Sequence, residues 1–429
     1  MNLNIPPVLL AGVLLAAVHP LLAATHHVSP TGDDAAAGSA TAPWRSLQRA
    51  VDRARPGDTI LLHDGTYRFA ATIQLTNSGT ADAPLRLHAA PGAKPVLCWE
   101  GWWPEDEKVR FLSRGLFLGG NHWHLKGLEI CHAPDNGLKI EGSHNVIEQC
   151  VFHHNGDSGL QIGLYKKGQN DGSLAASNLV LNCDSYRNFD PKTKGENADG
   201  FACKLFPGAG NRFVGCRAWE NADDGWDLYM TTFAVTIEHC WAWRNGDPSL
   251  FPELGSYAGD GNGFKLGGQN QPASHLVRHC IAFDHPFGSG NGFEDNNNTA
   301  PITVQHCVAW GNKTNFEFKK QAHVLENNIA FAPVSARQDA DLGEQVVSRG
   351  NSWQPDPKKP KKWISTATAA DFLSLDPALA AAPRQPNGDL PVNDLARLKP
   401  GSALVDRGVE VGLPFHGAAP DPGPFEVAP

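Results

Sequence analysis

Four aspartates with a shared spacing are the residues of this chain best suited to chemistry. They occur in two versions of one phrase, Asn197-Ala198-Asp199-Gly200-Phe201 and Asn221-Ala222-Asp223-Asp224-Gly225-Trp226-Asp227, with no lysine expected to neutralise them. Crowded carboxylates repel one another and raise each other's pKa, which a hard cation relieves. Ca²⁺ in particular takes several carboxylate oxygens as ligands. We therefore predict that Asp199, Asp223, Asp224 and Asp227 bind Ca²⁺.

Two other interpretations of the acidic phrases are weaker. Asp-Gly pairs are common in solvated turns, but a turn does not explain Asp227, which lies inside a strand-like phrase. Zn²⁺ prefers His and Cys ligands, and neither residue type is expected on this face. Ca²⁺ therefore remains the favoured ion.

A lysine in a related phrase is the candidate general base. Lys265 follows Gly263 by two residues, as Asp227 follows Gly225, so the two are expected at equivalent positions. A nearby divalent cation disfavours the charged form of a lysine, which lowers its pKa and makes it a base. Cation and amine together suit removal of a proton alpha to a carboxylate, followed by departure of a β leaving group. The alternative is a surface lysine in an exposed ion pair with Asp227.

These residues need a repeating scaffold that brings separate parts of the chain together. A phrase of Gly, apolar, any, apolar recurs from residue 137, with copies 22 residues apart (137 to 159) or 25 apart (200 to 225) where no insertion intervenes. Such a short repeat without helices predicts a parallel β-helix. Successive coils pair at about 4.8 Å, so equivalent residues form columns. Asp199 and Asp224 each directly precede Gly and are expected one coil apart.

Cysteine and asparagine are expected to occupy columns of their own. A disulfide needs Cβ atoms about 3.8 Å apart, closer than the strand spacing allows, so the cysteines are predicted to be buried free thiols that pack as small apolar groups. One inward column is expected to contain Cys131, Cys150, Cys183, Cys216, Cys240, Cys280 and Cys307. A second column is expected to form a hydrogen-bonded ladder of Asn155, Asn188, Asn221, Asn245 and Asn312.

The two ends of the chain differ from the repeats. Residues 1–24 are apolar and end in small residues, which predicts a signal peptide for secretion to the medium or periplasm and leaves residues 25–429 as a single domain. Ser46 is predicted to cap a short helix over the open end of the solenoid, and Thr59–Leu62 to form the first strand. From about residue 335 the chain is expected to be irregular and to pack on the solenoid, with Ala403–Val405 as a strand that closes its second end.

The charge of the chain limits its partners. The 429 residues carry a net charge of -9, which argues against nucleic acid. Apart from the N-terminal run, no stretch is long and apolar enough to suggest a membrane span. An acidic polysaccharide stays compatible with this charge if a cation bridges it to the protein.

Two segments around the candidate site resemble a known enzyme family. Glu196–Tyr229 and Gly259–Gly268 are similar to the pectate lyases of polysaccharide lyase family nine. The resemblance implies an all-β, right-handed parallel β-helix and a secreted enzyme that cleaves polygalacturonate by calcium-dependent β-elimination. It also implies the residue roles, with calcium bound by Asp199, Asp223, Asp224 and Asp227 and with Lys265 as the catalytic base.

Basic residues near the acidic phrases are candidates for binding the substrate. Lys204, Arg212 and Lys194 are within plausible reach of a polyanion, although exposed Lys and Arg are most often plain surface charge. We expect the protein to act as a monomer.

Three alternative functions remain open at the level of sequence. A hydrolase of the polygalacturonase type would use paired acids, but the Gly-His-Gly motif that those enzymes also carry is absent. A second alternative is a β-helix lyase for another uronate, such as alginate or a rhamnogalacturonan. A non-catalytic carbohydrate-binding solenoid would use calcium for structure only.

Overall fold

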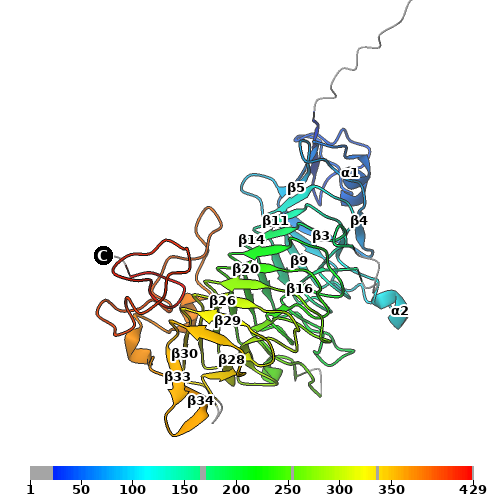
Figure 1. Ribbon diagram of the computed structural model, residues 1–429. Coiled ribbons are helices and arrows are strands. Elements are labelled where there is room, and N and C mark those ends of the chain that lie inside the picture. Colours follow the sequence, from blue (N-terminus) through cyan, green and yellow to red (C-terminus); the bar gives the residue numbers. More distant parts are fainter. Residues whose placement is uncertain (1–22, 165–170, 253–255, 335–337, 428–429) are drawn as a thin grey trace, which may run out of the picture.

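The computed structural model describes residues 23–164, 171–252, 256–334 and 338–427, which form a parallel β-helix with few helices (Figure 1). Residues 1–22, which include almost all of the predicted signal peptide, lie outside the described residues. Within the described ranges, no helix combines the length and the apolar character that crossing a membrane requires.

Three long sheets make up the three sides of the solenoid, and each complete coil contributes one strand to each sheet, while the strands at the two ends leave sheets 1 and 2 with 12 strands and sheet 3 with 10. Sheet 1 runs, in spatial order, β1 (Thr25–Val28), β2 (Thr59–Leu62), β5 (Leu85–Ala89), β8 (Trp123–Lys126), β11 (Val146–Glu148), β14 (Leu179–Leu181), β17 (Arg212–Val214), β20 (Thr236–Glu238), β23 (Leu276–Arg278), β26 (Thr303–Gln305), β29 (Val324–Glu326), β32 (Val347–Arg349). Sheet 2 runs β4 (Ile73–Leu75), β7 (Leu116–Leu118), β10 (Leu138–Ile140), β13 (Leu160–Ile162), β16 (Phe201–Cys203), β19 (Trp226–Asp227), β22 (Phe264–Lys265), β25 (Asn291–Glu294), β28 (Thr314–Phe318), β31 (Ala340–Leu342), β34 (Lys359–Ser365), β33 (Trp353–Asp356). Sheet 3 runs β3 (Gly65–Arg68), β6 (Pro95–Cys98), β9 (Glu129–Cys131), β12 (Val151–His153), β15 (Asp184–Tyr186), β18 (Arg217–Trp219), β21 (Trp241–Trp243), β24 (Ile281–Phe283), β27 (Val308–Trp310), β30 (Ile329–Phe331).

The inward residues of sheet 2 set the position of each coil through a stack of aromatic rings. Phe201, Trp226, Phe264, Phe293 and Phe316 are paired in register and fully buried. Successive ring centroids lie 5.1, 4.7, 4.7 and 4.9 Å apart. Burial of each such side chain contributes about 1.5–3 kcal/mol. Because side chains alternate along a strand, the residue after each ring points outward in a matching column.

The cysteine column is confirmed with one correction. The column consists of Cys150, Cys183, Cys216, Cys240, Cys280 and Cys307, linked by contacts such as the 3.4 Å hydrogen bond from the Cys280 backbone to the Cys307 thiol. All nine cysteines are free and buried, as predicted. The assignment of Cys131 to this column was wrong. It ends β9 and pairs in register with Cys98, because Leu128 takes the position before the strand that Cys150 takes in the next coil.

The asparagine ladder is confirmed. Asn155 donates to Asn188 (2.9 Å), Asn188 to Asn221 (2.8 Å) and Asn221 to Asn245 (2.9 Å), each through its side-chain amide. The chain of bonds continues through His285 to Asn312. Each amide also accepts a backbone N–H of the preceding coil, so the ladder satisfies buried polar groups at one corner.

A helix covers the first end of the solenoid, as predicted. In α1 (Leu47–Arg53) the Ser46 side chain accepts a hydrogen bond from the Arg49 backbone, and the apolar face of the helix is buried. The Asn77 side chain donates to two carbonyls at the other end of the helix. The prediction of the first strand was wrong, because Thr25–Val28 precedes it and pairs with Thr59–Leu62. The remaining described helices are single turns: α2 (Glu107–Arg110), η1 (Pro248–Leu250), η3 (Ala369–Asp371) and η4 (Pro377–Leu379).

The C-terminal part lies along the side of the stack (Figure 1). The predicted start of the irregular part, about residue 335, was too early, because β31 and β32 still pair in parallel with β28 and β29. The hairpin of β33 and β34 then extends sheet 2 by antiparallel pairing. The following chain is mostly irregular and packs on the outer face of sheet 3, where Phe372 stacks on Phe331 at 4.8 Å. Ala403–Val405 form a turn, so the predicted closing strand was wrong. Outward-facing apolar residues of sheet 3 are buried by this docking, and an ion pair between Arg384 and Asp184 adds to it.

Candidate active site

The outward face of sheet 2 carries the predicted site residues. Asp227 on β19 lies directly opposite Lys265 on β22, as their equal offsets from glycine predict. Asp199 and Asp224 directly precede the glycines that lead into β16 and β19, and the Gly200 backbone donates to the Asp224 carbonyl at 2.9 Å. The repeat therefore stacks the acidic phrases one coil apart and places the lysine one coil further on.

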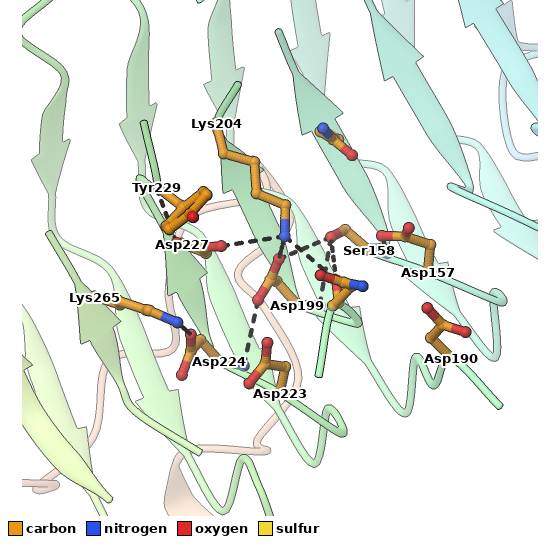
Figure 2. Close-up of polar contacts among 12 residues, drawn as sticks. Asp157, Ser158, Asp190, Asp199, Lys204, Asp223, Asp224, Asp227, Tyr229 and Lys265 are labelled. Carbon is orange, nitrogen blue, oxygen red and sulfur yellow. Dashed lines mark hydrogen bonds and ion pairs between the residues drawn. The ribbon is translucent and has the colours of Figure 1, made fainter. Parts of the chain in front are cut away.

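The four aspartates gather into two overlapping groups (Figure 2). One oxygen from each of Asp199, Asp224 and Asp227 lies within 4.8 Å of the others, and the same holds for Asp223, Asp224 and Asp260. The four predicted aspartates are at most 4% exposed. A set of buried carboxylate oxygens at this spacing matches the ligands that Ca²⁺ prefers.

Asp260 is a site residue that sequence reasoning missed. Its backbone N–H donates to Asp223 Oδ1 at 2.7 Å, and its carboxylate accepts from Lys265 Nζ at 2.8 Å. It lies in a long coil between β19 and β22, where the repeat is interrupted. The signals available in the sequence were its closeness to Lys265, five residues later, and its position inside the family-like segment Gly259–Gly268.

Surrounding donors orient the aspartates. Asn262 donates to Asp224 Oδ1 through its backbone (2.8 Å) and its side chain (2.9 Å). The Tyr229 backbone donates to Asp227 Oδ1 at 2.9 Å, and the Ser158 hydroxyl to Asp199 Oδ2 at 2.9 Å. By contrast, Asp224 Oδ2 is buried and accepts no hydrogen bond from any described residue, and it forms an ion pair with Lys265 Nζ at 3.3 Å. A buried carboxylate oxygen without a hydrogen bond needs a positive charge beside it, which Lys265 supplies here and which Ca²⁺ is suited to share, so the donor set fits Ca²⁺.

Burial dominates the protonation of the aspartates. It raises the pKa of Asp199 to about 7 and the pKa of Asp224 to about 8. Neighbouring carboxylates push both pKa values in the same direction, while Lys204 and Lys265 respectively oppose the shift. A bound divalent cation would favour the ionised forms.

Lys265 points toward the carboxylates from the next coil. Its Nζ lies 2.8 Å from Asp260 Oδ2 and 3.3 Å from Asp224 Oδ2. Burial by itself lowers the pKa of Lys265, but Asp224, Asp227 and the other carboxylates outweigh it and raise the pKa well above its ordinary value. Without a cation, the amine is therefore held in its charged form by the same oxygens that are suited to bind metal.

Lys204 neutralises part of the acidic cluster, contrary to the expectation that no lysine would. Its Nζ donates to Asp199 Oδ2 at 2.6 Å and to Asp227 Oδ2 at 3.1 Å, and the residue is 6% exposed (Figure 2). The candidate for substrate binding thus lies among the candidate metal ligands. Burial opposes its charge, but Asp199, Asp227 and Asp157 raise the pKa of Lys204 well above its ordinary value.

The other two substrate candidates lie apart from this cluster. Arg212 is on β17 of sheet 1, where its guanidinium forms an ion pair with Glu238 at 2.8 Å. Lys194 has an exposed side chain, and its carbonyl accepts a hydrogen bond from the Ala258 backbone at 3.0 Å. Neither side chain has a described contact with the four aspartates.

Two open cavities flank the aspartates along the axis of the solenoid. The cavity toward the N-terminal coils, of about 550 Å³, is lined by residues that include Gln161 and Lys204. The cavity toward the C-terminal coils, of about 570 Å³, is lined by Asp260, Glu294 and Glu317 among others. The site is therefore open on both sides, which suits a long chain molecule better than a small ligand.

Comparison with known proteins identifies the family. Residues 26–328 match the family described as "Pel9A-like, right handed beta helix region". The chain belongs to this family. Membership confirms the resemblance and the right-handed parallel β-helix predicted from the sequence, and it places this Pel9A-like protein among the polysaccharide lyases.

Relatives of the Pel9A-like chain match most of its length. Pectate lyase L of Dickeya dadantii (strain 3937) is 37% identical over 413 residues, covering 94% of this chain and 90% of the relative. Pectate lyase PEL9 of Emericella nidulans is 35% identical over 405 residues, covering 88% and 93%. The crystal structure of pectate lyase Pel9A superposes with a TM-score of 0.81 at 36% identity, covering 94% of this chain and 96% of that one.

Proposed function

We propose that this protein is a calcium-dependent pectate lyase that cleaves polygalacturonate by β-elimination, with Lys265 as the general base. The observation that carries the proposal is the pairing of Lys265 with Asp227 on adjacent strands, which places an amine beside buried carboxylates suited to a cation. The names of the relatives support the substrate class.

Each side chain has a distinct role in this proposal. Asp199, Asp223, Asp224 and Asp227 would hold Ca²⁺, which when bound neutralises a substrate carboxylate and stabilises negative charge that develops next to it. Lys265 Nζ accepts the proton alpha to the uronate carboxylate. The electron pair of the broken C–H bond forms a double bond, and the glycosidic oxygen leaves from the β position.

The base must be neutral before it can accept this proton. The carboxylates that raise the pKa of Lys265 are also the proposed metal ligands. A cation that compensates the charge of these carboxylates therefore lowers the pKa of the Lys265 amine. Asp260 Oδ2 holds Lys265 Nζ in place at 2.8 Å. Catalysis is expected to favour alkaline pH, because deprotonation of the lysine is required.

The proposal extends to the organisation of the chain. Residues 1–24 serve as a signal peptide, and residues 25–429 act as one catalytic domain that works as a monomer in the medium or periplasm. The contacts of the C-terminal segment with sheet 3 support a single unit. Size-exclusion chromatography and N-terminal sequencing of the exported protein test these points.

One assay separates the possible activities. The protein is incubated with polygalacturonate, with and without a chelator, while ultraviolet absorbance and reducing ends are followed. An unsaturated uronate product that requires Ca²⁺ supports the lyase. Reducing ends without absorbance indicate a hydrolase, an unsaturated product only from another polyuronate indicates a different lyase, and binding without any product indicates a non-catalytic solenoid.

A further inference from the structure

The cavity on the N-terminal side of the aspartates contains buried polar atoms that the fold leaves without partners. The side chain of Gln161 is fully buried at the cavity wall, and its Oε1 accepts a hydrogen bond from Asn136 at 3.0 Å. Gln161 Nε2 and Asn136 Oδ1 have no hydrogen-bond partner among the residues that the structure describes. Of these two residues Gln161 lines the cavity, and its free donor at the wall points to a ligand that can accept a hydrogen bond.

The position of Gln161 relates this cavity to the proposed reaction centre. Gln161 pairs with Ala202 on the next strand, and Ala202 pairs with Asp227, so all three belong to one outward column of sheet 2. Two strand spacings separate Gln161 from Asp227, about 10 Å in all. A sugar chain that crosses the aspartates along the solenoid axis therefore reaches Gln161 with a unit beyond the one at the cleavage site.

The remaining walls of the cavity are partly apolar and partly charged, with equal numbers of basic and acidic side chains. Phe117 lies two coils before Gln161 in the same column, and Leu112, which follows α2, is 64% exposed at the rim. The charged side chains at the cavity comprise two bases and two acids, Arg114, Lys204, Glu141 and Asp157. An apolar wall with a few fixed polar groups is the usual lining of a small-molecule site. The hydroxyl edge and the apolar face of a sugar ring match these two kinds of wall.

We propose that this cavity is a distal subsite that binds one sugar unit of the polysaccharide, with Gln161 Nε2 donating to a ring hydroxyl, Asn136 holding the Gln161 amide in place and Phe117 packing on the ring. The subsite rests on the proposed function, because it needs a chain held across the aspartates. It predicts a preference for long oligosaccharides. Gln161 is a specificity residue here and takes no part in proton transfer.

Binding to a catalytically inactive protein tests the subsite. In the full-length Lys265→Ala variant with saturating Ca²⁺, affinities for digalacturonate and hexagalacturonate are measured by isothermal titration calorimetry. Addition of Gln161→Leu is expected to weaken hexamer binding about tenfold, the cost of lost hydrogen bonds, and to leave dimer binding unchanged. A dimer centred over Asp227 ends before Gln161, which lies two strand spacings away.

Two companion variants keep the test decisive. Gln74→Leu makes the same change in the same column one coil before Phe117, where the side chain is exposed outside the cavity, and should change neither affinity. Phe117→Ala should weaken hexamer binding even if the Gln161 variant folds poorly, as thermal unfolding would reveal. Equal loss for both oligomers, or no loss for the hexamer, overturns the subsite. Failure of the Lys265→Ala parent to bind either oligomer overturns the proposed substrate, and the subsite with it.

Discussion

Lys204 Nζ lies 2.6 Å from Asp199 Oδ2, inside the group of carboxylates that is suited to bind a cation. The protein thus carries its own positive charge at the site, in addition to Lys265. Lys204 and Lys265 approach the aspartates from different coils, on the two sides of Asp199 and Asp224 (Figure 2).

Lys265→Ala should lower the rate of polygalacturonate cleavage by at least about 100-fold, because a general base contributes about 10²–10⁴-fold. The rate is measured by the ultraviolet absorbance of the product, with thermal unfolding to confirm the fold. Lys319→Ala is the matched control, since Lys319 forms ion pairs on the same sheet with Glu317 and Asp341 and is half exposed. Wild-type activity in the Lys265 variant would contradict its role as base.

Lys204→Met should destabilise the calcium-free protein by about 3–5 kcal/mol, because loss of one partner leaves buried carboxylates uncompensated. Ca²⁺ supplies the missing positive charge, so the rise in melting temperature on Ca²⁺ addition should be larger in the variant than in the wild type. Lys126→Met is a control, because Lys126 pairs with Glu148 nearer the surface. An unchanged calcium-free melting temperature would show that Lys204 does not compensate the cluster.

Stability without Ca²⁺ should fall as pH rises from about 4 toward 8. The folded pKa values of Asp199 (about 7) and Asp224 (about 8) exceed the value of about 3.9 for an unfolded Asp. The folded state therefore holds more protons, and its advantage is lost as pH rises through the folded pKa values. Thermal unfolding across this range with chelator tests the trend. Ca²⁺ should reverse most of the loss, and a flat profile under both conditions would contradict the assignment.

Asp184→Asn should loosen the C-terminal segment from the solenoid. Asp184 accepts hydrogen bonds from Arg217 (2.7 Å) on the next strand and from Arg384 (2.7 Å) in the C-terminal segment. Burial opposes ionisation, yet Arg217 and Arg384 lower the pKa of Asp184 below its ordinary value. Asp184 therefore stabilises the folded state at pH values above its unfolded pKa, and this stabilisation is lost as pH falls through its folded pKa. Limited proteolysis near neutral pH should cut the variant's C-terminal segment faster than that of the wild type; equal rates would rule this contact out as the anchor.

The repeat in the sequence was enough to predict which residues face one another across coils. Asp227 and Lys265 are 38 residues apart (265 minus 227), yet both follow a glycine by two positions, and their strands pair in that register. Parallel strands with aromatic residues stacked inward leave a single register that keeps every ring buried. Local pattern therefore determined the coils, the asparagine ladder and the core of the candidate site.

Other residues were placed only by tertiary structure, because they lie where the repeat stops. Lys204 comes directly after β16, before Leu205 and Phe206 in left-handed conformation, so strand alternation no longer predicts its direction. Asp260 lies in an inserted coil. The C-terminal segment has no repeat, and its position depends on apolar contacts with sheet 3. In a periodic sequence the repeat itself determines which residues become neighbours. An aperiodic segment instead takes the position in which long-range packing and charge interactions are most favourable.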